Sequence, residues 1–352
     1  MSRIKMTTVA LKAGVSTATV SRVLNNSGYV SDETRRKVLE ATKDMNYVKT
    51  HRNLIGLIVP DTPNPFFSQL GFMFERALER ESPRKHLLTL CSEGRADREM
   101  ELIEWAKHIG VEGLIYVSSG KSSETLLRLA ASMPIPTVAF DRQVVPGQLD
   151  YVAVNSKQGT LAAVDHLVAH GHERIAYLKG KKDTETAKER FESFVEAMNR
   201  NGLKINHDWV YEGNYMFAAG RTCAEELVQL AEHNRPTALL AANDVMAIAA
   251  MQRLQQEGWI LPKMLSIVGF DDLEWSKWCF PALTTIAQPI SKLVEEALAL
   301  LNKRIKEQVN GTVRSSPSHV EIEPILVPRD SVAKPVDYTS TPKFRVLTAS
   351  NS

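Results

Sequence analysis

The chain has 352 residues, 43% of them hydrophobic, which is enough to fill two or three hydrophobic cores. Its formal net charge is only +2, but this charge is unevenly distributed. Residues 1–52 contain ten Lys or Arg and four Asp or Glu, whereas the rest of the chain is mildly acidic. A basic N-terminal segment predicts a polyanionic partner for that segment, and charge alone leaves a solvated surface as the alternative.

Cysteine usage and hydropathy indicate the cellular compartment in which the protein is found. Cys91, Cys223 and Cys279 are far apart and form no Cys-X-X-Cys pair, which favours buried thiols in a reducing environment over a disulfide framework or a zinc site. The first residues contain no apolar segment as long as a signal peptide, and no later run could span a bilayer. We expect a cytoplasmic, nucleoid-associated protein that does not bind a membrane.

The first 47 residues predict three short helices. The first ends at Gly14, the second is capped by Ser16 and the third is capped by Ser31, because serine caps helix N-termini and glycine ends helices. Asp32 and Glu33 lie favourably in the first turn of the third helix. The residues expected to face inward are Val9, Ala10, Ala13, Val20, Val23, Leu24, Val38, Leu39, Thr42 and Met45.

Two helices joined by a glycine-containing turn and braced by a third match a helix-turn-helix module. In that module the second helix enters the major groove, so Thr17 and Ala18 are expected over base edges, with Arg22 one turn further. Contacts with the DNA backbone or the groove edge are expected from Ser16, Thr19, Ser21, Asn25 and Tyr29. A structural helical hairpin is the alternative, which the string AGVSTATVSRVLN disfavours.

From Leu54 onward the sequence alternates strands and helices, which predicts an α/β core. The expected strands cover residues 54–60, 86–92, 113–119, 136–142, 151–155, 174–180, 209–213, 238–243, 265–272 and 284–289. The helices expected between them include residues 67–81, 97–109, 157–169, 185–201 and 245–257. These are too many strands for one short sheet, so we expect two doubly wound parallel-sheet lobes.

Polar and aromatic residues follow several of the expected strands, where ligands bind in such sheets. They are Asp61, Asn64, Asp141, Arg142, Asn243, Asp244, Asp271, Asp272 and Gln288, with Phe66, Phe67, Phe140 and Phe270. Carboxylates, amides and arginine bond neighbouring hydroxyls, and aromatic rings cover the C–H face of a pyranose. The pattern predicts a small, neutral, hydroxyl-rich ligand, although a single strand-end Asp means little.

Catalytic patterns are weak. SSGKSS at residues 118–123 imitates a phosphate-binding loop, but Ile115 stands where the first glycine is required. The chain contains no Gly-X-Gly-X-X-Gly, and its histidines lack the His-Glu-X-X-His spacing. We expect no enzymatic activity, no catalytic residue, no metal and no cofactor.

The strings VALKAGVSTATVSRVLNN and SDETRRKVLEATKDMNY resemble the DNA-binding head of the lactose-repressor (LacI/GalR) family. IGLIVPDTPNPFF, PTVAFDR, LLAANDVMAIAAMQRL, LSIVGFDD and PALTTIAQP resemble that family's core, which is of periplasmic-binding-protein type I and similar to ribose-type sugar-binding proteins. The resemblance extends from about Met6 to Asp330.

This resemblance implies a homodimer that binds a pseudo-palindromic double-stranded DNA operator. A small sugar bound between the two core lobes would change the operator affinity of a repressor of carbohydrate-utilisation genes. The resemblance supports the strand-end residues as effector contacts and adds Arg190 and Tyr215 to them. A solute-binding protein without DNA function is the alternative, and an enzyme acting on sugar phosphates is a third possibility. The identity of the sugar and the sign of the response stay open.

The implied boundaries are residues 1–47 for the head, 48–54 for a short hinge, 55–330 for the core and 331–352 for a flexible tail. Within the core, the first lobe would take residues 55–153 and 284–313, and the second 154–283 and 314–330. The hinge VKTHRNL is shorter than the hinge helix of the family and lacks its alanine and leucine pattern. We therefore expect operator binding without a side chain wedged in the minor groove, while Lys49 and Arg52 contact phosphates.

Overall fold

The computed structural model describes residues 6–24, 28–45, 53–120, 135–142, 149–312 and 315–336. Asn25, Lys49 and Arg52, which were predicted to bind DNA, lie outside these ranges, as do most of the hinge and residues 337–352. The chain forms two compact units, Met1–Asn155 with Asp183–Thr186 and Pro289–Glu323, and Ser156–Lys182 with Ala187–Gln288 and Pro324–Ser352. The three N-terminal helices of the first unit are here called the head, and the remainder of each unit is called its lobe.

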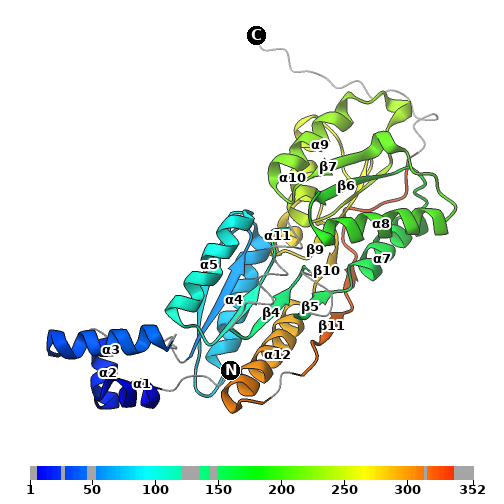
Figure 1. The fold of residues 1–352 in the computed structure, drawn as a ribbon. Coiled ribbons are helices and arrows are strands. Elements are labelled where there is room, and N and C mark those ends of the chain that lie inside the picture. Colours follow the sequence, from blue (N-terminus) through cyan, green and yellow to red (C-terminus); the bar gives the residue numbers. More distant parts are fainter. Residues whose placement is uncertain are drawn as a thin grey trace, which may run out of the picture. The chain divides into compact units, whose positions relative to one another are not determined.

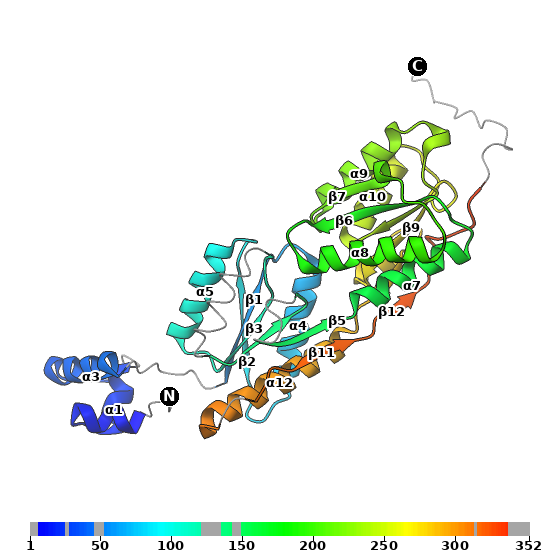
Figure 2. The same ribbon diagram turned by 45° about the vertical axis from the view of Figure 1, so that its right-hand side comes forward.

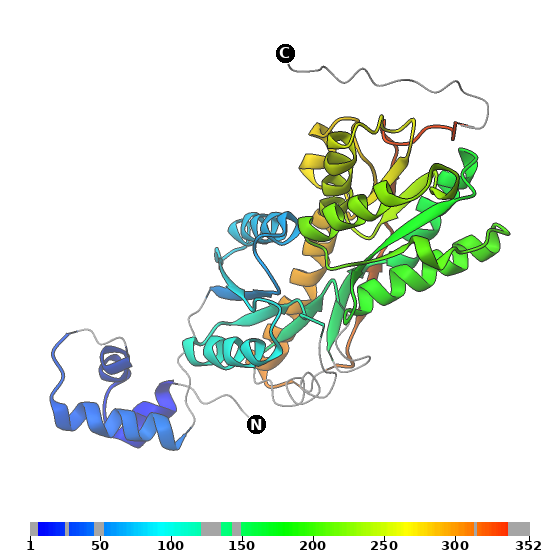
Figure 3. The same ribbon diagram turned by 90° about the horizontal axis from the view of Figure 1, so that it is seen from above.

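The head consists of α1 (Met6–Ala13), α2 (Thr17–Leu24) and α3 (Asp32–Asp44), shown in dark blue in Figure 3. Their shared core contains Val9, Val20 and Val38, which are fully buried. The predicted caps are confirmed: Ser16 Oγ accepts a hydrogen bond from the Thr19 amide (3.1 Å), and Ser31 Oγ accepts one from the Thr34 amide (3.4 Å). The serines therefore determine where α2 and α3 begin.

One predicted core position in the head is wrong. Leu39 is 49% exposed, whereas Ala41, which was not predicted to face inward, is 4% exposed. Adjacent helical positions differ by about 100° in direction, so the narrow stripe through Val38, Ala41 and Thr42 leaves Leu39 at its edge.

The first lobe is a six-stranded sheet of order β11-β5-β4-β3-β1-β2. Its strands are β1 (Leu54–Val59), β2 (His86–Cys91), β3 (Gly113–Tyr116), β4 (Thr137–Phe140), β5 (Asp150–Val154) and β11 (His319–Ile322). The helices among the described residues of this lobe are α4 (Pro65–Glu79), α5 (Ala96–Ile109) and α12 (Ile290–Asn310). Figure 2 shows α5 on one face of the sheet and α4 with α12 on the other, so both faces of the apolar strands are covered.

The second lobe repeats this arrangement with the order β12-β10-β9-β8-β6-β7. Its strands are β6 (Ile175–Lys181), β7 (Val210–Gly213), β8 (Ala238–Ala241), β9 (Ser266–Asp271), β10 (Thr284–Ala287) and β12 (Ile325–Val327). Its α-helices are α7 (Ser156–Ala169), α8 (Glu185–Arg200), α9 (Phe217–Gln229), α10 (Asp244–Gln256) and α11 (Glu274–Trp278), and short 3₁₀ turns cover His207–Trp209 and Glu232–Asn234. In Figure 1, α9 and α10 lie on one face of the sheet and α7 and α8 on the other.

Two doubly wound lobes were predicted, and both have the strand order in which a ligand site forms beside the first strand, where the winding direction reverses. The ten predicted strands are present. The short strands β11, which is parallel to β5, and β12, which is antiparallel to β10, were not predicted.

The predicted positions at which the chain passes from one lobe to the other are wrong. Strand β10 pairs with β9 and belongs to the second lobe, so the chain changes lobe after Gln288 rather than at residue 284. Strand β11 pairs with β5 and belongs to the first lobe, so the last change follows Glu323 rather than residue 313. A strand pattern does not specify which of two similar sheets the strand joins, and this choice depends on side-chain packing.

Part of the predicted flexible tail is ordered. Residues 331–336 run along the second lobe, and Ser331 is 1% exposed. The Ser331 hydroxyl donates to the Ile267 carbonyl (2.5 Å) and accepts from the Thr284 amide (2.8 Å). Beyond it, a ring nitrogen of the buried His172 lies 2.9 Å from the Ala333 carbonyl, and burial lowers the pKa of His172 to about 4. The polar composition that predicted flexibility therefore supplies buried hydrogen bonds.

Truncating the chain after Asp330 is expected to lower the free energy of unfolding of the core by about 3 kcal/mol, because buried partners of Ser331 and Ala333 lose their hydrogen bonds. Truncation after Val336 keeps these bonds and is the matched control. Urea unfolding followed by circular dichroism measures the difference, and equal midpoints for both truncations would contradict the stabilising role of residues 331–336.

Candidate DNA-binding and effector-binding sites

The exposed face of α2 presents the side chains predicted to read DNA. Thr17, Ala18 and Arg22 are exposed, while Val20 and Val23 on the opposite face are buried in the head. The helix is therefore held by one face and open along the other, as a groove-reading helix requires.

The residues predicted to contact the DNA backbone lie on α2 and in the segments next to it. Ser16 and Thr19, whose hydroxyls are 2.9 Å apart, lie at its N-terminal end, and Ser21 is half-buried on α2. Tyr29 is 93% exposed in the turn before α3. These side chains are accessible to phosphate and sugar groups, which is the arrangement that positions a reading helix.

In the first lobe, the turn between β1 and α4 is built by two predicted residues. The Asn64 amide donates to Asp61 Oδ1 (2.8 Å), and the Asn64 side chain caps α4 by accepting from the Phe66 amide (3.1 Å). Phe66 and Phe67 follow in the first turn of α4 with their rings 5.3 Å apart, edge to face. All of these side chains except Asp61 are buried within the lobe, and Asp61 is half-buried.

The end of β4 brings Asp141 and Arg142 to the same lobe edge as Phe67. Arg142 Nη1 donates to the Ser118 carbonyl (2.7 Å), and its guanidinium lies 5.8 Å from the centre of the Phe67 ring. Asp141 has φ +63°, a left-handed conformation that is costly for an aspartate and is found preferentially at functional sites.

A buried carboxyl that was not predicted supports this edge. Glu99 on α5 is 1% exposed and accepts hydrogen bonds from the Tyr116 hydroxyl (2.8 Å) and the Ser119 amide (2.6 Å). Burial raises the pKa of Glu99 above its ordinary value. Its place on a charged helix, ADREMELIEW, predicts exposure, so the sequence contains no signal for this role.

In the second lobe, Arg190 on α8 is 3% exposed. Its Nη1 donates to the Ala242 carbonyl (2.6 Å), its Nε donates to Ser156 Oγ (3.3 Å), and its guanidinium lies 3.5 Å from the centre of the Phe270 ring. The planar group is thereby fixed between the ends of β8 and β9, in a geometry that suits bidentate recognition.

The other candidates in the second lobe are linked in pairs. Asn243 Nδ2 donates to the Tyr215 carbonyl (3.1 Å), and Gln288 Nε2 donates to Asp271 Oδ1 (2.7 Å). The Tyr215 ring lies so close to Gly180 that a Cβ there would be 2.2 Å from it, which explains the glycine. Tyr215 (φ +69°) and Asp271 (φ +125°) adopt strained backbone conformations like that of Asp141.

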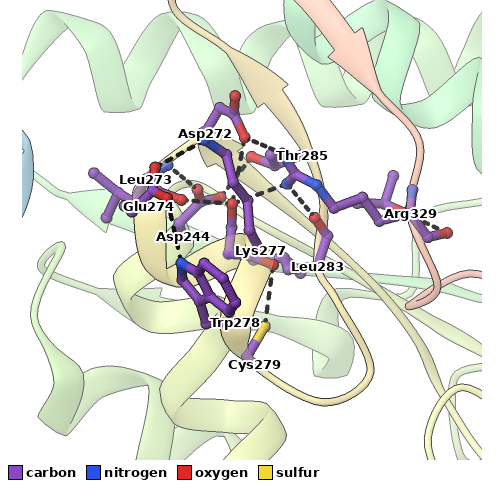
Figure 4. A network of polar contacts seen from close by, with 12 residues as sticks. Asp244, Asp272, Leu273, Glu274, Lys277, Trp278, Cys279, Leu283, Thr285 and Arg329 are labelled. Carbon is purple, nitrogen blue, oxygen red and sulfur yellow. Dashed lines mark hydrogen bonds and ion pairs between the residues drawn. The ribbon is translucent and has the colours of Figure 1, made fainter.

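The structure thus gathers Asp61, Asn64, Phe66, Phe67, Asp141 and Arg142 at strand ends of the first lobe, and Arg190, Tyr215, Asn243, Asp271 and Gln288 at strand ends of the second. Asp244 and Asp272 also follow strands; the Asp244 carboxyl accepts from the Leu273 amide, and Asp272 pairs with Arg329, as Figure 4 shows. Over the ranges that the structure describes, no group of three or more His, Cys, Asp or Glu side chains could hold a metal ion. Within the same ranges, no helix has the length and apolar character needed to cross a membrane.

A three-helix head with one exposed helix, followed by two doubly wound lobes with polar strand ends, defines a helix-turn-helix regulator with a ligand-binding core. Comparisons with known proteins agree. Residues 5–50 match the family described as "Bacterial regulatory proteins, lacI family", and residues 164–332 match the "Periplasmic binding protein-like domain".

Curated relatives extend over nearly the whole chain. The HTH-type transcriptional repressor PurR of Aliivibrio salmonicida (strain LFI1238) is 32% identical over 336 residues, which cover 93% of this chain and 98% of that protein. PurR of Pasteurella multocida (strain Pm70) is 33% identical and covers 92% of this chain and 97% of its own length.

Among solved structures, a complex of the transcriptional regulator CelR with cellobiose superposes with a TM-score of 0.71 at 26% identity, covering 94% of this chain and 100% of that chain. The lac repressor dimer bound to operator and the anti-inducer ONPF gives a TM-score of 0.69 at 25% identity, covering 94% and 99%. The chain belongs to the lacI family of bacterial regulatory proteins. The prediction of a DNA-binding transcriptional repressor, and not an enzyme, is confirmed by these relatives.

Proposed function

We propose that this repressor binds a pseudo-palindromic operator as a homodimer and that a small sugar changes its operator affinity. The second lobe would hold the sugar through Arg190, Asn243, Asp271 and Gln288, and the strand-end residues of the first lobe are further candidates for effector contacts. The observation that carries the proposal is the Arg190 guanidinium, a buried charged donor group that Ala242 and Phe270 fix at the ends of β8 and β9. The solved complex of the similar regulator CelR with cellobiose supports a sugar.

The mechanism is thermodynamic linkage. A sugar that binds one state of the core better than another shifts the population toward that state, and the heads of the dimer then bind the operator with a different affinity. A coupling of about 1–3 kcal/mol, or roughly 5- to 150-fold in operator affinity, is the ordinary range for such proteins. Binding measurements identify the sugar, and operator affinity measured with and without that sugar shows whether the sugar strengthens or weakens DNA binding.

Two binding experiments test the proposal. Incubation with genomic DNA fragments at two salt concentrations should retain specific fragments at both, because specific binding exceeds non-specific binding by several orders of magnitude. A thermal-shift screen with D-ribose, D-galactose, D-glucose and cellobiose should raise the melting temperature for at least one sugar. Sugar binding without fragment selection would favour a solute-binding protein, and fragment selection without any sugar effect would reject the sugar effector.

Replacing Arg22 with alanine is expected to weaken specific operator binding about tenfold or more, because the exposed guanidinium is the side chain of α2 best suited to guanine. Arg36→Ala, on the exposed face of α3, is the matched control and should retain base preference. Fluorescence anisotropy with operator and scrambled duplexes measures both variants. If Arg22→Ala discriminates between the duplexes as well as the original chain, Arg22 does not read bases.

The hinge hypothesis stays a prediction. Seven residues, VKTHRNL, reach at most about 25 Å when extended, which suffices for a tether but not for a tether and a helix. We infer that Lys49 and Arg52 meet phosphates there and that no side chain is wedged into the minor groove. A structure of the operator complex with a helix inserted at the operator centre would refute this.

A further inference from the structure

A buried carboxyl lies directly behind the proposed effector residues of the second lobe. Asp244 is the first residue of α10, next to Asn243, and is fully buried. Its Oδ2 accepts a hydrogen bond from the Leu273 amide (2.8 Å), and its Oδ1 lies 2.5 Å from the Thr285 hydroxyl (Figure 4). A Cβ at position 269 would lie 2.2 Å from Oδ1, so the β9 backbone approaches the carboxyl closely.

The Leu273 amide belongs to the turn that carries Asp271. Asp271 (φ +125°) and Asp272 (φ +57°) both lie in the left-handed region, and residues other than glycine keep such conformations when the surrounding structure holds them. Asp244 supports the turn from one side. On the other side, Arg329 pairs with Asp272 and donates to the Leu283 carbonyl (2.7 Å) and the Ser276 hydroxyl (2.8 Å).

The protonation state of Asp244 changes the quality of this support. When protonated, the carboxyl accepts from the Leu273 amide and exchanges a hydrogen bond with the Thr285 hydroxyl without a buried charge. When ionised, it accepts stronger hydrogen bonds from these two donors, but the cost of keeping a charge out of water exceeds this gain and favours opening of the turn to water. The charged or titratable groups that act on it are Asp272 in the turn, Arg329 after β12 and Cys279 after α11. Glu274 and Lys277 of α11 are paired with each other.

We propose that Asp244 is a positioning residue for the effector site, and that loss of its proton loosens the turn carrying Asp271 and weakens effector binding. The inference rests on the proposed role of Asp271 as an effector contact, but its structural part stands on the contacts of Asp244 alone. Burial raises the pKa of Asp244 to about 7, although the hydrogen bonds from Thr285 and Leu273 lower it, and the Asp272 carboxylate adds a smaller increase; the change therefore falls near neutral pH.

Thermodynamic linkage determines whether stability rises or falls with pH. Because the pKa of Asp244 is higher in the folded chain than its ordinary value of 3.8, the folded state loses stability relative to the unfolded state as pH rises from about 4 to about 7. Above that range the loss is complete and constant. An opened turn hydrates Asp244 and returns its pKa toward the ordinary value, so the open fraction of the turn rises between pH 6 and pH 8, and effector binding, which requires the closed turn, should be tighter at pH 6.

Asp244→Asn in the full chain tests the proposal, since the amide oxygen can accept from the Leu273 amide and the amide nitrogen can donate to Thr285 Oγ1. Hydrogen exchange of the peptide spanning residues 271–280 is measured at pH 6 and pH 8 and corrected for intrinsic exchange rates. The original chain should lose about tenfold in protection at pH 8, and Asp244→Asn should lose none. Asp165→Asn, an exposed carboxyl-to-amide change on α7 of the same lobe, should behave like the original chain.

Sugar binding is measured with D-ribose, D-galactose, D-glucose and cellobiose. Any of these sugars that binds the original chain should bind it several-fold more weakly at pH 8 than at pH 6. The same sugar should bind Asp244→Asn equally at both pH values. If no sugar binds, the sugar effector is rejected while the exchange data still judge the role of Asp244. The proposal is overturned if residues 271–280 of the original chain are equally protected at both pH values. It is also overturned if Asp244→Asn loses as much protection at pH 8 as the original chain does. An Asn variant that is unprotected and less stable at both pH values overturns it as well, since it would show a merely structural role.

Discussion

Replacing Arg190 with alanine is expected to abolish the response of operator binding to sugar while leaving operator binding without sugar unchanged. Arg190 is 3% exposed, and two of its five N–H donors are used by Ala242 and Ser156. The donors that remain can make charge-assisted hydrogen bonds to sugar hydroxyls, each worth about 1.5–3 kcal/mol. Losing two such bonds would weaken sugar binding about a hundredfold or more.

Isothermal titration with the sugar found by thermal shift, and operator anisotropy with and without that sugar, measure the two halves of this expectation. Arg200→Ala is the matched control, because Arg200 ends the same helix, is exposed and pairs with Asp165 on α7. It should keep both sugar binding and the operator response. An Arg190→Ala variant that loses operator binding in the absence of sugar would show that the arginine supports the fold instead.

Much of the architecture could be predicted because its signals are local. Ser16 and Ser31 precede helices and cap them through their own side chains, a short-range interaction visible in sequence. The strand LIGLIV is buried on both faces in the first lobe, which a continuous apolar run predicts. The strand-end residues lie at the predicted lobe edges because parallel strands share one carboxyl edge.

The remainder depends on contacts between residues far apart in the chain. Asp244 was predicted as one of several strand-end polar residues, but its partners Leu273 and Thr285 are 29 and 41 residues away and turn it into a support. Ser331 was assigned to a flexible tail, since no local pattern reveals that Ile267 and Thr284 need its hydroxyl. Buried polar networks of this kind are specified by the assembled fold, so a linear pattern does not distinguish them from surface residues.

Arg304 on α12 is a larger example of the same kind. It is 3% exposed, and its Nε and Nη2 donate to the two carboxylate oxygens of the fully buried Asp150 at 2.5 and 2.7 Å. Further bonds from Nη1 reach Glu307 (2.8 Å) and the Ser315 carbonyl (2.9 Å). The arginine thereby joins α12, the start of β5 and the segment that leads to β11.

Replacing Arg304 with methionine is expected to lower the free energy of unfolding of the core by about 3–5 kcal/mol, because the Asp150 carboxylate is left buried without its counter-charge. The Asp150→Asn, Arg304→Met double variant removes both charges and should recover part of this loss. Lys303→Met, an exposed change one residue earlier on α12, is the control and should alter stability by less than about 0.5 kcal/mol. Urea unfolding gives all three values. A loss below about 1 kcal/mol for Arg304→Met would mean that water reaches Asp150 in the variant, and that the segment from α12 to β11 is held by its apolar contacts rather than by this ion pair.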